Sequence, residues 1–305
     1  MIEVSGLSKT YGRRRDPAVK DVSFDIRDGE IVGLAGLNGA GKTTTISAIT
    51  GIILPSDGQI LVDGMDIISE KARASAGIGW VSEFPSFEQN ARPAQLLVYY
   101  AGFHGMRRGE ARERAEDVLK AVGLEHALDR KIRTYSQGMK KRFGLASAML
   151  SDPQNYLLDE ILNGLDPEGM RYVRNLLLEF RKNGKAVLLS THILGVLQDL
   201  ADRVLILQNG RVLEALTREQ MRKLGKPSFK LRTDRIDGKL IELLSVFGNV
   251  STSGEHVVIS GIDATDALAG EISAAVASGG YRLFHLSIES ESLEDHFLQL
   301  TRDAG

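Results

Sequence analysis

Apolar and polar residues alternate at the start of the chain and then give way to an uninterrupted apolar run. The alternation in MIEVSGLS (1–8) and AVKDVSFDI (18–26) predicts two half-buried strands. EIVGLAG (30–36) ends in glycine and is typical of a strand buried on both faces of a parallel sheet. A helix is expected from about residue 42 to the glycine at 51, and GQILVDGMDI (58–67) indicates a strand pair around an Asp-Gly turn.

The middle of the chain changes to a helical pattern and then returns to apolar strands. Residues from 92 to about 151 are mostly helical in pattern, and apolar strands are expected at 155–160, 185–191 and 202–210. Between the first two strands, Asp166 is the expected N-cap of a helix, Pro167 its first residue and Gly184 its end. This strand–helix–strand order predicts a parallel α/β sheet.

The last part of the chain reads as a second, smaller α/β pattern. QNGR (208–211) predicts a tight hairpin turn, and RKLGKPS (222–228), further along the chain, is typical of a linker. We therefore expect two domains, a larger α/β domain over 1–222 with a helical subdomain at about 90–150, and a small α/β domain over 223–305.

Composition excludes several classes of protein. The 38 basic and 40 acidic residues give a net charge of -2, so a broad basic face for nucleic acid is not expected. The absence of cysteine excludes disulfides and thiolate metal sites. No apolar run approaches the roughly 18 residues of a membrane span, so any work at a membrane requires another polypeptide.

A glycine-rich loop follows the buried strand. GLNGAGKT (36–43) fits the phosphate-binding pattern G-x-x-x-x-G-K-[ST] at every position. If the pattern holds, its backbone N–H groups converge on phosphate oxygens, Lys42 would reach the β- and γ-phosphates, and the Thr43 hydroxyl would bind Mg²⁺. A plain glycine-rich turn is the alternative, and the loop alone does not separate a GTPase from an ATPase or a kinase.

Two carboxylates end the next apolar strand. In NYLLDE (155–160), Asp159 is placed to hold Mg²⁺ at the C-terminal end of the strand. Glu160 is then placed to orient or deprotonate the attacking water. The alternative is a solvated turn, which the phosphate-binding loop makes less favourable.

A second phosphate-seeking surface begins at Ser136. The serine hydroxyl, the N–H of Gly138 and a helix N-terminus all favour an anion. One nucleotide does not need two such surfaces from one chain, which suggests a dimer in which each chain completes its partner's site. The alternative is an N-capped surface helix whose Lys140, Lys141 and Arg142 form a solvated basic turn.

These motifs together resemble the ATP-binding subunit of ABC transporters over residues 1 to about 220. They come in that family's order: Tyr11, the phosphate-binding loop, a loop around Glu83, the signature YSQGMKKR (135–142), YLLDE (156–160), NGLDP (163–167) and STH (190–192). The resemblance implies a P-loop NTPase (RecA-like) fold, ATP and Mg²⁺ as cofactors, and a head-to-tail homodimer. It also implies a transmembrane permease partner that holds the chain at the cytoplasmic face of the cell membrane.

The resemblance also implies a role for each site residue. Glu160, His192 and Lys42 are the expected catalytic residues, and Thr43, Glu83 and Asp159 the expected Mg²⁺ ligands. His192 contacts the γ-phosphate in this interpretation, although a lone strand-end histidine is more often structural. The expected nucleotide-binding residues are Tyr11, which stacks on adenine, Gly36, Asn38, Gly39, Ala40, Gly41, Lys42, Thr43, Thr44, Ser136 and Gly138.

The sequence departs from the family pattern at three places. Gln137 and Met139 change the usual LSGGQ signature, which puts ribose contacts there in doubt. Glu83 replaces a glutamine, and Ile161 and Leu162 replace Pro-Thr or Pro-Ser after the acidic pair. The glutamate, the signature and the ending SLEDHFLQLT (292–301) resemble the branch that serves exporters of drugs, polysaccharides or lipids.

We therefore expect an ATPase subunit of an exporter, docked to a separate membrane protein near the Glu83 loop and residues 92–130. A non-transport ABC ATPase acting on DNA or ribosomes is the main alternative, and no nucleic-acid partner is expected. A weakly hydrolysing nucleotide sensor is a third class. The cargo, the direction of transport and the role of the C-terminal domain stay open.

Overall fold

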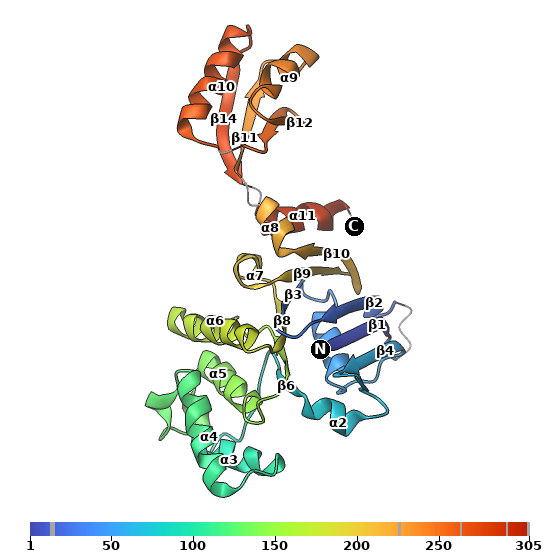
Figure 1. Cartoon of the computed structure of the whole chain (residues 1–305), viewed down its shortest axis with the longest axis vertical. Helices are drawn as coiled ribbons and strands as arrows, with labels where there is room; N and C mark the ends of the chain where they lie inside the picture. Colours follow the sequence, from blue (N-terminus) through green and yellow to red (C-terminus); the bar gives the residue numbers. More distant parts are fainter. Residues whose placement is uncertain (13–15, 225–226, 263, 291, 304–305) are drawn as a thin grey trace. The chain divides into compact units, whose positions relative to one another are not determined.

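The computed structural model describes residues 1–12, 16–224, 227–262, 264–290 and 292–303 (Figure 1). It divides into two compact units, Met1–Arg218 and Glu219–Gly305. The boundary expected after residue 222 falls inside helix α8 (Arg218–Leu224). The expected linker 222–228 therefore begins as helix, and its residues 225 and 226 lie outside the described residues.

A six-stranded sheet in the order β10-β9-β3-β8-β7-β6 forms the centre of the first unit. Its strands are β3 (Ile31–Ala35), β6 (Ile78–Val81), β7 (Asn155–Asp159), β8 (Ala186–Thr191), β9 (Arg203–Gln208) and β10 (Arg211–Thr217). All pairings are parallel except that of β9 with β10. Every residue of β3, β7 and β8 is buried, as their continuous apolar sequences predicted.

The predicted tight turn between β9 and β10 is confirmed. Asn209 and Gly210 both have positive φ, 48° and 75°, which is the backbone twist that a two-residue hairpin turn requires. Asp63 and Gly64 repeat this conformation between β4 and β5, with φ of 50° and 77°. Both Asn/Asp-Gly turns were readable from the sequence because few other residues adopt positive φ.

A four-stranded antiparallel sheet lies beside the central sheet in the first unit (Figure 1). Its order is β2-β1-β4-β5, from the strands β1 (Ile2–Lys9), β2 (Val19–Ile26), β4 (Asp57–Val62) and β5 (Met65–Asp66). Helix α1 (Lys42–Ile49) contributes Ile46 and Ile49 to a shared core with Val4, Ile60 and Val32. This core fixes the position from which the phosphate-binding loop enters α1.

The remaining helices of the first unit include the expected helical region. They are α2 (Lys71–Ala76), α3 (Pro93–Phe103), α4 (Arg108–Ala121), α5 (Gln137–Ala148), α6 (Pro167–Lys182) and α7 (Leu194–Leu200), with single 3₁₀ turns at Glu125–Ala127 and Ile132–Thr134. Helices α3, α4 and α5 gather at one end of this unit (Figure 1). The Asp166 carboxylate caps α6 by accepting from the N–H of Gly169 at 3.0 Å.

The basic turn of α5 is not solvated. Lys141 and Arg142 are only 5% and 6% exposed, and the Arg142 guanidinium donates to the carbonyls of Val122 and Gly123. The alternative of a surface helix with a solvated basic turn is therefore wrong for these two residues. Lys140 alone of the three is half-buried.

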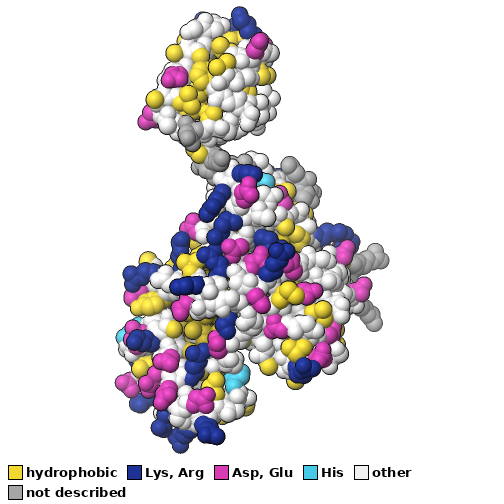
Figure 2. Space-filling model, in the orientation of Figure 1, with side chains coloured by type: hydrophobic (Ala, Val, Ile, Leu, Met, Phe, Trp, Pro, Cys, Tyr) yellow, Lys and Arg dark blue, Asp and Glu magenta, His cyan; other side chains and the backbone are white. Residues whose placement is uncertain are grey.

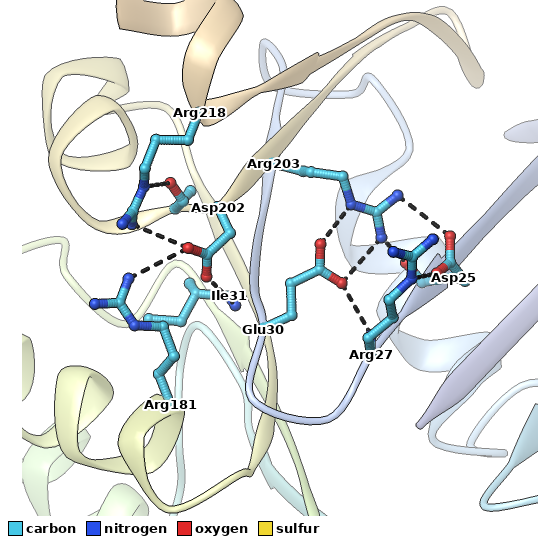
Figure 3. A network of polar contacts seen from close by, with 9 residues as sticks. Asp25, Arg27, Glu30, Ile31, Arg181, Asp202, Arg203 and Arg218 are labelled. Carbon is cyan, nitrogen blue, oxygen red and sulfur yellow. Dashed lines mark hydrogen bonds and ion pairs between the residues drawn. The ribbon is translucent and has the colours of Figure 1, made fainter.

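Ion pairs join the antiparallel sheet to the central one (Figure 3). The Arg203 guanidinium, at the start of β9, pairs with Glu30 at 2.5 Å and with Asp25 of β2 at 3.2 Å. Next to it, Asp202 pairs with Arg181 from the end of α6 and with Arg218 at the start of α8. These contacts hold the start of β9 against β2, α6 and α8.

The second unit has its own antiparallel sheet and core. The strand order is β12-β13-β11-β14, from β11 (Pro227–Thr233), β12 (Asn249–Ser253), β13 (His256–Ser260) and β14 (Leu283–Ser290). Its helices are α9 (Gly238–Ser245), α10 (Asp266–Ser278) and α11 (Leu293–Asp303). Phe229 and Leu231 of the sheet pack with Leu240 of α9 and Ile272 of α10. The sequence analysis missed β12, because NVSTS shows no apolar alternation.

Charges of both signs are interspersed on the visible face of the molecule (Figure 2).

Candidate nucleotide-binding site

The phosphate-binding loop lies between β3 and α1 and depends on two glycines that have no room for a side chain. A Cβ on Gly36 would lie 2.7 Å from the carbonyl oxygen of Leu207 and 2.9 Å from the Cβ of Ala40. Gly41 has a φ of 109°, and its Cβ would lie 2.8 Å from the carbonyl of Ala18. The loop is therefore pressed against neighbouring backbone, and within it the N–H of Ala40 donates to the carbonyl of Leu37 at 3.1 Å.

Lys42 and Glu160 form a buried pair beneath this loop. The Lys42 ammonium donates to the Gly36 carbonyl at 2.7 Å and lies 3.2 Å from Oε1 of Glu160. The two side chains are only 6% and 5% exposed. Oε1 of Glu160 makes no hydrogen bond to the described residues, so its contact with Lys42 is an ion pair without hydrogen-bond geometry.

The backbone of Glu160 is strained. Its φ is 48°, in the left-handed region that costs an L-residue with a side chain about 1–2 kcal/mol. Its N–H donates to the carbonyl and hydroxyl of Ser190, and its carbonyl accepts from the Lys141 ammonium at 2.5 Å. Strain of this kind persists where the surroundings hold it, and such places cluster at active sites.

The other carboxylate oxygen of Glu160 has two polar neighbours. Oε2 accepts from the side-chain amide of Asn163 at 2.7 Å and lies 3.2 Å from Nδ1 of His192. Asn163 also lies 3.4 Å from that imidazole nitrogen. The predicted catalytic residues Glu160, Lys42 and His192 therefore form one connected group, with His192 at its exposed end (55% exposed).

The residues predicted to bind Mg²⁺ offer only oxygen atoms. Asp159, 1% exposed, ends β7 and accepts from the hydroxyl of Ser190 at 2.6 Å. Among the described residues, no group of three or more histidine, cysteine or acidic side chains could hold a metal. A donor set of one or two carboxylates and the Thr43 hydroxyl fits Mg²⁺, which takes oxygen ligands and completes its shell with water and phosphate oxygens.

A cleft of about 450 Å³ opens above the loop. It brings Tyr11 and Glu83, which are far from the loop in sequence, to the same place as Lys42 and Glu160. Tyr11 is 41% exposed, with the Lys9 ammonium 5.2 Å from its ring centre. The lining residues are Tyr11, Ala18, Asn38, Gly39, Gly41, Lys42, Thr43, Thr44, Glu83 and Glu160.

Ser136 and Gly138 do not line this cleft. They lie at the N-terminus of α5, where the Ser136 oxygen accepts from the N–H of Met139 at 3.1 Å. A Cβ on Gly138 would lie 3.1 Å from the carbonyl of Gly164, so this turn packs on the NGLDP loop. The serine O–H remains able to donate to an anion, because capping uses only an acceptor position. Gly36, Ala40, Asp159 and His192 are also absent from the lining.

Sequence reasoning gave no role to three residues around Glu160. Asn163 and Ser190 belong to the NGLDP and STH motifs. Each motif stands at or just after the end of an apolar strand, and this position was the only sign that the two residues lie near the site. Lys141 was assigned to a basic turn, and nothing in its immediate sequence indicates burial. Its hydrogen bond to Glu160 is visible only in the folded chain.

Comparisons with known proteins identify a family and several relatives. A family model described as ABC transporter matches residues 19–163. The bacitracin transport ATP-binding protein BcrA of Bacillus licheniformis is 30% identical over 98% of this chain and 97% of its own length. The doxorubicin resistance ATP-binding protein DrrA of Mycobacterium tuberculosis is 29% identical over 99% of this chain and 94% of its own.

A solved structure described as the dimeric structure of a bacterial ABC transporter cassette is also similar. It covers 72% of this chain and 99% of its own, with a TM-score of 0.67 and 25% identity. Within the described residues, no helix has the length and apolar character to cross a bilayer. The chain belongs to the ABC transporter family as an ATP-binding subunit and ATPase, related over nearly its full length to drug-resistance ATPases.

Proposed function

We propose that two copies of this chain, arranged head to tail, hydrolyse ATP to drive export through a separate membrane-spanning partner. One observation carries the dimer. Lys42 and Glu160 share a cleft within each copy, whereas Ser136 and Gly138 lie outside it on the same unit. These two groups serve one nucleotide if a second copy brings its α5 N-terminus to the open side of the cleft.

Within one copy, different residues of the cleft bind the adenine and the phosphates of the nucleotide. Tyr11 stacks on the adenine ring, and the backbone N–H groups from Asn38 to Thr44 surround the phosphates. Lys42 exchanges its contact with Glu160 for the β- and γ-phosphates. Thr43, Asp159 and Glu83 would hold Mg²⁺, which would supply positive charge next to the phosphates.

Glu160 is the group that orients the attacking water. When Lys42 turns to phosphate, Oε1 is left without a partner among the described residues and is free to accept a proton from water. Asn163 and His192 keep the other oxygen in place. In this proposal His192, at the exposed end of this group, contacts the γ-phosphate and so reports whether ATP is intact.

Export and a permease partner are supported by the relatives and by the surface. Two similar proteins are a bacitracin transport ATP-binding protein and a doxorubicin resistance ATP-binding protein. Exposed aromatic side chains occur on α3 and on the loop after β6, where a partner was expected to dock. Binding to such a partner would hold the chain at the cytoplasmic face of the cell membrane.

A Glu160→Gln variant tests this function. It keeps the size of the side chain but not the base, so ATP binding is retained while turnover falls at least about 100-fold. With ATP, the variant accumulates as a dimer, measured by light scattering after size-exclusion chromatography. Normal turnover in Glu160→Gln would remove the water-orienting role.

A double variant, Glu160→Gln with Ser136→Arg, serves as the control for the shared site. It binds ATP within one copy but remains monomeric, because the arginine blocks the approach of α5 to the partner's nucleotide. A dimer that persists in this double variant contradicts the head-to-tail arrangement.

A further inference from the structure

Lys141 is a buried cation that the proposed mechanism does not use. It lies on α5, five positions after Ser136, and its side chain is 5% exposed. Its ammonium donates to the main-chain carbonyl of Glu160 at 2.5 Å. A buried charge costs free energy unless it is paired and hydrogen-bonded, so its retention here calls for an explanation.

The carbonyl that Lys141 contacts belongs to the strained residue. With a φ of 48°, Glu160 needs its neighbours to hold its backbone, and the direction of its carboxylate follows from that backbone. Ser190 of β8 holds the N–H side of this residue. On the carbonyl side the contacts come from Lys141 and from the N–H of Asn163 at 3.2 Å.

Burial is the main influence on this ammonium and leaves the pKa of Lys141 below its ordinary value. The charges of Glu83, Glu160 and Asp159 act on this pKa in the opposite direction. Three carboxylates thus lie close enough to affect this one amine. When Lys42 turns to the phosphates, Lys141 stays near these carboxylates, because its hydrogen bond is to the main-chain carbonyl of Glu160 and not to the nucleotide.

We propose that Lys141 is a positioning residue, which ties the helix that begins at Ser136 to the backbone of Glu160 in the same copy. This inference rests on the water-orienting role proposed for Glu160. It has a further consequence for a head-to-tail dimer. The α5 N-terminus contacts the partner's nucleotide, and the same helix holds the catalytic carboxylate of its own site. Each copy therefore links the two sites through one hydrogen bond.

The test compares steady-state ATPase kinetics of the full-length chain and its Lys141→Met variant, which removes the charge and the donor. We expect kcat to fall about 10- to 100-fold, because small misplacements of a catalytic group have effects of this size. The affinity for ATP stays within about twofold, since Lys141 does not line the cleft. The melting temperature of the first unit falls, because the Glu160 carbonyl keeps only the N–H of Asn163, and circular dichroism shows whether the variant is folded.

Two matched variants separate positioning from general damage. Lys140→Met makes the same chemical change at a half-buried neighbour whose amine has no hydrogen bond to the described residues, and it keeps wild-type kinetics. Lys141→Gln keeps a donor without the charge, and it recovers part of the lost kcat. If Lys141→Met proves unstable, the test is the kcat of Lys141→Gln, which is expected to lie below that of the wild type and of Lys140→Met.

The inference is overturned if Lys141→Met turns over ATP within about twofold of the wild type while Glu160→Gln is inactive. An equal loss in Lys140→Met, or a loss of ATP affinity in step with kcat, also contradicts it. Normal turnover in Glu160→Gln is a different result, because it removes the proposed role of Glu160 itself.

Discussion

At the scale of single residues, the folded chain places charges where their partners decide their protonation. Asp25 is an example outside the site. Burial disfavours its ionised form, but Arg203, 3.2 Å away, and Arg27, 3.0 Å away, outweigh burial and hold the pKa of Asp25 below 3.8 (Figure 3). A folded-state pKa below the unfolded one means that the ionised carboxylate stabilises the fold.

The sign of this effect predicts a pH dependence for Asp25→Asn. At pH 7 the variant is less stable by about 0.5–1 kcal/mol, a small value because solvent screens this partly exposed carboxylate. The difference is present above the ordinary pKa of 3.8 and disappears as the pH falls through the lower folded-state pKa. Urea unfolding of both proteins from pH 7 down to about 3 measures it.

Asp129→Asn is the matched control, because the Asp129 side chain is 99% exposed and its contact with Arg92 is at 3.8 Å. It should be neutral across the same pH range. A difference between Asp25→Asn and the wild type that persists unchanged at the acidic end would mean that the ion pairs of Asp25 do not contribute.

At the scale of elements, α3 leaves an aromatic pair in solvent. Tyr99 and Phe103, one turn apart, are 64% and 72% exposed, and their rings meet edge to face at 5.1 Å. Phe84 on the loop after β6 is 75% exposed. Exposed groups of this kind are typical of protein interfaces, where aromatic side chains carry much of the binding free energy.

A Tyr99→Ser, Phe103→Ser double variant tests α3 as the docking element for the permease. Co-purification with a co-expressed membrane protein from a neighbouring gene should fall at least about tenfold, because the partner loses two aromatic contacts. ATPase activity without the partner should not change. Leu54→Ser, at a residue 59% exposed between α1 and β4, is the control. Equal co-purification of the double variant would exclude this surface.

Elements with a strong local signal were predictable, and contacts between distant elements were not. The buried strands, the two Asn/Asp-Gly turns and the Asp166 cap followed from apolar runs, positive φ and helix capping. The polar strand β12 carried no such signal. The burial of Lys141 and the amide of Asn163 on Glu160 depend on α5, β7 and the NGLDP loop meeting in space, which one-dimensional patterns do not encode.

At the scale of the whole molecule, each of the two units has a hydrophobic core of its own among the described residues. One includes Ile46, Val32 and Leu188, and the other includes Phe229 and Leu231, with no residue in common. The phosphate-binding loop and its cleft belong to the first unit alone. Domains with their own cores unfold as separate cooperative units unless an interface joins them.

We therefore predict two thermal transitions in calorimetry. ATP should raise the midpoint temperature of the transition that belongs to the first unit and leave the other unchanged. A ligand at 100 times its Kd stabilises the unit that binds it by about 2.7 kcal/mol and leaves the other unchanged. The single tryptophan, Trp80 on β6, reports the first unit by fluorescence. The shift should vanish in Lys42→Ala. Two transitions that rise together with ATP would show that the units unfold as one.

The pair of Lys42 with Glu160 has one more implication. In the empty site Lys42 pairs with Glu160, so these two charges largely neutralise each other, while the Glu83 carboxylate also lines the cleft. A group with several anionic oxygens, such as a triphosphate, is expected to compete with Glu160 for the Lys42 ammonium. In the proposed mechanism, ATP binding and the release of Glu160 from Lys42 would therefore occur together. A protomer without nucleotide would keep the Glu160 carboxylate paired and away from water.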